Sequence, residues 1–163
     1  MGLIRIVWGT AHAPTAMSSY DAALAEANVH NYNLVQVSSV IPDGASIEAV
    51  GTAPDLGPAG ERLTVVEGRK AVSEGTAVAG LGWACEPSGR GIFYETSGTD
   101  VDAVETKLTR GLNAGRELRD WTFTDEGRKI VRTPVESGSE LESKSGCTTA
   151  VVLAVYGEST PLL

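Results

Sequence analysis

The sequence has few of the residues that build disulfide frameworks and metal sites. Its 163 residues include two cysteines, Cys85 and Cys147, and two histidines, His12 and His30. Two cysteines so far apart exclude a disulfide framework or a zinc cluster, and a pair of reduced thiols is the simpler interpretation. Because neither histidine lies in a recognisable metal-ligand pattern, the sequence predicts no metal site.

Long apolar runs are absent as well. No stretch approaches the ~20 apolar residues that cross a bilayer. The apolar segment at residues 3–8 is too short for a secretory signal peptide and runs directly into polar sequence. The sequence therefore predicts a protein without a membrane partner, and by default a cytoplasmic location.

Positive charge is scarce. Asp and Glu number 21 against 13 Lys and Arg, which gives a net charge of −8, and the only lysines are Lys70, Lys107, Lys129 and Lys144. Such a field repels phosphate backbones, which argues against nucleic-acid binding, and it suits a cationic substrate. An acidic, lysine-poor chain is also expected in a high-salt cytoplasm, so we predict a halophilic source, with an acidic mesophilic protein as the alternative.

Several catalytic motifs are missing. No glycine-rich phosphate loop precedes a Lys-Ser or Lys-Thr pair, which excludes the common nucleotide-hydrolase pattern. Gly80-Leu81-Gly82 is too short for a dinucleotide fingerprint, and its glycines are better explained by close packing within a strand. The sequence has no Gly-x-Ser-x-Gly motif after a predicted strand, so a serine hydrolase is not supported.

Hydrophobic periodicity predicts an α+β protein. A short helix is expected over residues 20–27, with Ser18 and Ser19 as candidate N-caps, and a longer helix over residues 100–120. About eight strands are expected, over residues 4–8, 33–37, 63–67, 75–84, 91–96, 121–123, 129–135 and 148–156. No internal repeat or linker divides the chain, so residues 1–163 are predicted to form one domain.

Three segments carry a resemblance to a known family. A serine pair by itself usually marks a turn or a helix cap. Here the pair lies in Asn33-Leu34-Val35-Gln36-Val37-Ser38-Ser39-Val40-Ile41-Pro42, which closely resembles the processing segment of pyruvoyl-dependent arginine decarboxylases. Asp21, in Tyr20-Asp21-Ala22-Ala23-Leu24, lies upstream at the spacing that this family shows. The segment Gly91-Ile92-Phe93-Tyr94-Glu95 resembles the strand that carries the family's catalytic glutamate.

This resemblance implies a self-cleaving precursor. Ser39 Oγ attacks the carbonyl of Ser38 and replaces the peptide bond by an ester, and elimination across Ser39 then releases residues 1–38. Hydrolysis of the remaining dehydroalanine leaves residues 39–163 with an N-terminal pyruvoyl group derived from Ser39. That ketone condenses with the substrate's α-amine and withdraws the electrons freed when CO2 leaves.

The resemblance also assigns roles to individual residues. Glu95 is expected to be the general acid that protonates the α-carbon, with Ile92, Phe93 and Tyr94 as apolar neighbours that favour a raised pKa. The alternative is a strand glutamate that faces water. Substrate binding is assigned to Asp21, Asn33 and Ser38.

Two of these binding residues have simpler explanations. A carboxylate at Asp21 can accept paired hydrogen bonds from arginine's guanidinium, but an acid near a helix N-terminus is also common. Asn33 is expected to orient the Ser38 carbonyl or the substrate, but an asparagine at a strand end often bonds its own turn.

The family likeness implies a lyase that decarboxylates L-arginine to agmatine and CO2, in polyamine biosynthesis. It implies a four-layer αββα sandwich assembled as a homotrimer, with active sites between subunits. Two alternatives stay open. The same scaffold could act on another cationic amino acid such as lysine or ornithine, or the chain could be an uncleaved, non-catalytic binding or partner subunit.

Overall fold

The computed structural model describes residues 2–134 and 145–163. In chain order its elements are β1 (Leu3–Ala13), α1 (Ala16–Glu26), β2 (Asn33–Gln36), β3 (Val40–Ile41), β4 (Ser46–Gly51), β5 (Arg62–Val72), β6 (Val78–Cys85), β7 (Gly91–Gly98), α2 (Val101–Glu117), β8 (Asp125–Arg132) and β9 (Cys147–Tyr156).

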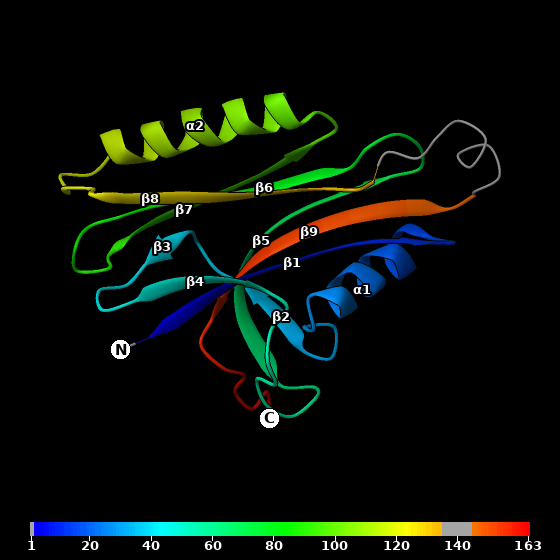
Figure 1. Cartoon of the computed structure of the whole chain (residues 1–163). Helices are drawn as coiled ribbons and strands as arrows, with labels where there is room; N and C mark the ends of the chain where they lie inside the picture. The colour runs from blue at the N-terminus through cyan, green and yellow to red at the C-terminus, as the bar shows by residue number, and fades with distance from the viewer. Residues whose placement is uncertain (1, 135–144) are drawn as a thin grey trace.

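These elements form four layers, as expected. The strands make a five-stranded sheet, in the order β2-β5-β9-β1-β4, and a four-stranded sheet, in the order β3-β7-β6-β8. We call them sheet A and sheet B. Helix α1 packs on β1, β5 and β9 of sheet A, and α2 packs on β6, β7 and β8 of sheet B. The two sheets lie between the two helices (Figure 1), which confirms the αββα sandwich.

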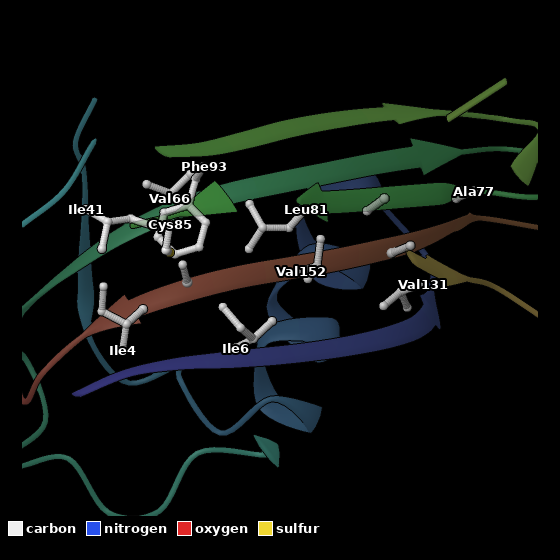
Figure 2. Close-up of a cluster of buried hydrophobic side chains, with 13 residues drawn as sticks. Ile4, Ile6, Ile41, Val66, Ala77, Leu81, Cys85, Phe93, Val131 and Val152 are labelled. Carbon is white, nitrogen blue, oxygen red and sulfur yellow. The ribbon is translucent and has the colours of Figure 1, made fainter. Parts of the chain in front are cut away.

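Period-two alternation sends the side chains of each strand to two separate cores. On β9, Val152 and Ala154 point to the core between the sheets, whereas Val151 and Val155 point to the core beneath α1. The run from Cys147 to Tyr156 is apolar on both faces because both faces are covered. Figure 2 shows the inner core, where Leu81 and Phe93 of sheet B face Ile6 and Val152 of sheet A.

Both helices begin at capping residues. Thr15 caps α1 in a capping box with Ser18, so the prediction of Ser18 or Ser19 as the N-cap is wrong by three or four residues. Asp100 caps α2 by accepting from the Ala103 N–H. In the part of the chain that the structure describes, no helix is long and apolar enough to cross a membrane.

Helix α2 packs closely on β6 because two strand residues lack a side chain. A Cβ at Gly80 would lie 2.8 Å from Val104 Cγ1, and one at Gly82 would lie 2.8 Å from Leu112 Cδ1. The interpretation of Gly80 and Gly82 as packing glycines is confirmed, because the buried face of α2 occupies the space that their side chains would take.

Some predicted strand boundaries are wrong. Residues 121–123 form no strand, because Trp121 and Phe123 instead pack on the small core beneath α2. The strand expected over 129–135 begins earlier, at Asp125, and Val135 lies outside the described residues. The short strands β3 and β4 were not predicted, since neither shows a clear alternation.

Candidate active site

The serine pair lies where the chain crosses from one sheet to the other. Strand β2 is an edge strand of sheet A and β3 is an edge strand of sheet B. The last bond to sheet A is donated by the Val37 N–H to the Val65 carbonyl, at 3.1 Å. The first bond to sheet B is accepted by the Ser39 carbonyl from the Phe93 N–H, at 2.8 Å. Ser38 and Ser39 thus span the step between the layers, with Ser38 exposed and Ser39 partly buried.

Glu95 meets Ser39 at this step. Ser39 Oγ donates a hydrogen bond of 3.0 Å to Glu95 Oε2. Glu95 is two residues after Phe93 on β7, so both side chains emerge on the face of sheet B that is turned toward sheet A. Glu95 is exposed in the single chain, so its apolar neighbours along the strand do not bury it. The structure thus joins two of the predicted site residues, Ser39 and Glu95, and Ser38 is the residue immediately before Ser39.

Two further hydrogen bonds hold the backbone after the serine pair. The Val40 N–H donates to the Ser38 carbonyl, at 2.8 Å, and closes a three-residue turn centred on Ser39. The Tyr156 hydroxyl donates to the Val40 carbonyl, at 3.0 Å. Burial and the negative charge of Glu95 raise the pKa of Tyr156 to about 12, so this hydroxyl remains protonated at neutral pH.

Tyr156 is the last residue of β9 in sheet A, and its side chain crosses the core between the sheets to reach Val40, next to the serine pair. Its ring packs edge-on against Phe93, with centroids 6.1 Å apart. Sequence reasoning missed this residue, although its place in the β9 alternation puts it on the same face as Val152 and Ala154. Nothing local in the sequence connects it to a serine pair more than a hundred residues away.

Asp21 occupies a different layer. It is exposed on α1, which covers the other face of sheet A, and no hydrogen bond within residues 2–134 and 145–163 joins it to Ser39 or Glu95. Its neighbour Tyr20 points inward and donates a 2.7 Å hydrogen bond to Glu67 Oε2. The Gln36 side chain donates to the other oxygen of Glu67, at 3.2 Å. One buried carboxylate thus fixes both the segment that carries Asp21 and the strand that leads to the serines.

Burial raises the pKa of Glu67. Its side chain is 0% exposed, and loss of hydration outweighs the stabilising hydrogen bond from Tyr20 and the positive charge of Arg69. The Arg69 guanidinium lies 4.5 Å from the centre of the Tyr20 ring. The same burial, together with the hydrogen bond to Glu67, raises the pKa of Tyr20.

Asn33 lies at the opposite end of β2 from the serine pair. It is the first residue of the strand, and five residues at about 3.3 Å each put its Cα up to about 16 Å from that of Ser38. Its side chain donates to the Gly60 carbonyl at 2.8 Å, and its N–H donates to the Glu61 carbonyl. Within one chain, Asn33 therefore binds the neighbouring loop.

Among the described residues, no group of three or more His, Cys, Asp or Glu could hold a metal ion. The site consists of a serine hydroxyl, a carboxylate, and backbone groups held by Phe93 and Tyr156. Such a set can move a proton from the serine and stabilise charge on a carbonyl oxygen.

Comparison with known proteins places the chain among enzymes. Residues 3–161 match the family described as pyruvoyl-dependent arginine decarboxylase (PvlArgDC). A protein of that name from Halobacterium salinarum, a halophile, is 47% identical over 164 residues, which cover 99% of this chain and 98% of the relative. Proteins of the same name from Pyrococcus furiosus and Methanopyrus kandleri are 32% and 29% identical, and the matches cover 90% and 93% of each chain.

Proposed function

Because the chain belongs to the pyruvoyl-dependent arginine decarboxylase family, we propose that it cleaves itself between Ser38 and Ser39 and then decarboxylates L-arginine to agmatine and CO2. The observation that carries this proposal is the 3.0 Å hydrogen bond from Ser39 Oγ to Glu95. It pairs the nucleophile of the cleavage with a carboxylate that can accept its proton.

The bonds and protons of the proposed cleavage balance with Ser38, Ser39, Glu95 and one water molecule. Ser39 Oγ gives its proton to Glu95 and bonds to the Ser38 carbonyl carbon; the bond from that carbon to the Ser39 nitrogen breaks, and the nitrogen takes the proton. Loss of the Ser39 α-proton and rupture of the Cβ–Oγ bond then release the Ser38 carboxylate. The dehydroalanine tautomerises to an imine, which one water hydrolyses to the pyruvoyl ketone and ammonia.

The surroundings of Ser39 fit the group that it would become. The Ser39 carbonyl, which would lie beside the ketone, is already fixed by the Phe93 N–H. When formed, the ketone would take up the substrate's α-amine and accept the electrons freed as CO2 leaves. The 3.0 Å hydrogen bond between the Ser39 side chain and Glu95 supports a role for Glu95 as the acid that protonates the α-carbon of the substrate.

Arginine recognition is assigned to Asp21, and it requires more than one chain. Asp21 lies on α1 on the far side of sheet A from the Ser39–Glu95 pair, and Asn33 lies at the far end of β2. A site that uses all four residues is completed if a second chain supplies Asp21 and Asn33. Three exposed valines flank the serines and support such a contact: Val35, Val37 and Val40. The homotrimer that the family likeness implies supports it as well.

Denaturing intact mass of the purified protein tests the cleavage. We expect fragments of about 4 and 13 kDa (38/163 and 125/163 of 17.0 kDa), the larger with a blocked N-terminus. Ser39→Ala removes the nucleophile and should give a single 17.0 kDa chain without arginine decarboxylation. A wild-type protein that stays whole after long incubation in high salt would favour an uncleaved binding or partner subunit instead.

A further inference from the structure

The backbone around Ser39 provides a donor to the carbonyl that the cleavage attacks. The Val40 N–H lies 2.8 Å from the Ser38 carbonyl oxygen. When Ser39 Oγ adds to that carbonyl, its oxygen becomes negatively charged, and a donor already at 2.7–3.1 Å stabilises that charge without reorganisation. The turn therefore contains an oxyanion donor made from the chain's own backbone, two residues after the attacked carbonyl.

The peptide unit that holds this donor is itself polarised. The Val40 N–H and the Ser39 carbonyl belong to the same peptide bond, and that carbonyl accepts the Phe93 N–H at 2.8 Å. A peptide that accepts at its oxygen is a stronger donor at its nitrogen, because the two hydrogen bonds polarise each other. Strand β7 thus aligns and strengthens the oxyanion donor.

The next peptide unit is fixed from the other sheet. Strand β3 has only two residues, which pair with Ile92 and Gly91 at the edge of sheet B. A strand this short has few backbone bonds to hold its direction. The Tyr156 hydroxyl, which donates to the Val40 carbonyl at 3.0 Å, ties it to β9 of sheet A. Packing of its ring on Phe93 holds that hydroxyl in place.

We propose that Tyr156 is a positioning residue of the self-cleavage: its hydroxyl holds the Val40 carbonyl and so keeps the Val40 N–H directed at the Ser38 carbonyl. This inference rests on the proposed function. It concerns the first step, in which the Ser39 Oγ–Ser38 carbon bond forms, the Ser38–Ser39 peptide bond breaks, and the proton of Ser39 Oγ ends on the Ser39 nitrogen.

Tyr156→Phe tests this role because it keeps the ring that packs on Phe93 and removes only the donor. The rate of cleavage is measured on pulse-labelled precursor from cell-free translation, quenched in denaturant and separated by mass. We expect the rate to fall about tenfold, or about 1.4 kcal/mol, which is near the upper end of what a single hydrogen bond contributes. Tyr32→Phe is the matched control, because the Tyr32 hydroxyl donates to the Gly57 carbonyl at 2.9 Å and does not contact the junction.

Hydroxylamine separates a defect in ester formation from a defect in the later elimination. It cleaves an ester, so it releases residues 1–38 from any variant that forms the ester but is slow in elimination. Tyr156→Phe is expected to remain slow in hydroxylamine, since its defect precedes the ester. Full recovery in hydroxylamine would overturn the inference, and so would equal cleavage rates in the wild type and Tyr156→Phe.

A backbone substitution tests the oxyanion donor without altering a side chain. Replacing Val40 by its α-hydroxy acid converts the N–H to an ester oxygen, and we expect a loss of about 10²- to 10³-fold in the cleavage rate, as for other oxyanion donors. A change of less than threefold would contradict the role of the turn. If the wild type itself never cleaves, the proposed function fails, whereas a cleaving wild type with an unaffected Tyr156→Phe refutes this inference alone.

Discussion

Replacement of Glu95 by glutamine should slow self-cleavage and not only decarboxylation. The family resemblance in the sequence predicts a role for Glu95 only after cleavage, as the general acid of the decarboxylation. The 3.0 Å hydrogen bond from Ser39 Oγ shows that, in the uncut chain, this carboxylate contacts the nucleophile of the proposed cleavage. A positioned general base contributes about 10²- to 10⁴-fold. Because Glu95 is exposed in the single chain, water can partly replace it, so we expect the low end of this range, about 10²-fold or about 2.7 kcal/mol.

The assay compares the appearance of the fragment 1–38 in wild type, Glu95→Gln and Glu48→Gln. Glu48 is the matched control because it is also an exposed strand glutamate, on β4 at the opposite edge of sheet A from β2. The amide of Glu95→Gln still accepts a hydrogen bond from Ser39 but is a far weaker base, so the geometry is kept while the proton acceptor is lost. Cleavage of Glu95→Gln within twofold of the wild-type rate would refute the role of Glu95 as the base.

Two other substitutions test the residues around α1. Asp21→Asn should raise the KM for arginine about 10- to 100-fold, since hydrogen bonds to charged groups contribute about 1.5–3 kcal/mol, and should leave the cleavage rate unchanged; an unchanged KM would remove Asp21 from substrate binding. Glu67→Gln should alter how stability depends on pH. Because burial raises the folded-state pKa of Glu67 above 4.5, the folded protein binds this proton more tightly, and its stability falls as pH rises from 4.5 through that pKa. Urea-unfolding midpoints should therefore favour Glu67→Gln increasingly as pH rises, and parallel curves for the two proteins would contradict this.

The fold could be predicted wherever one physical pattern covered a whole element. Strand β9 is apolar on both faces and bounded by polar sequence, and α2 has buried positions at helical spacing, so both were found with small errors at their ends. Strands β3 and β4 escaped prediction, because β3 is two residues long and β4 is an edge strand with four exposed positions. Trp121 and Phe123 suggested a strand from their propensity, yet tertiary packing beneath α2 determines their conformation.

The sequence likewise predicted some of the site residues and missed others. Ser38, Ser39 and Glu95 were predicted as site residues from short segments that resemble a family, and a hydrogen bond joins Ser39 and Glu95 in the structure. Tyr156 and the Val40 N–H had no such signal. A backbone N–H has no residue identity, and a tyrosine at the end of a buried strand is compatible with simple core packing. Their contribution depends on how two sheets meet in space, which no local pattern in the sequence records.

The proposed cleavage between the sheets would leave the two fragments assembled. The fragment 1–38 contains β1, which lies between β9 and β4 and pairs with β9 from Ile4 to Ala13. Helix α1 in the same fragment buries Ala23 and Leu24 in the core beneath sheet A. Strand β2 remains paired to β5 on one side of the cut, and β3 remains paired to β7 on the other. The cut removes only the link between two edge strands, so the fragments should separate in denaturant and remain a single folded unit without it.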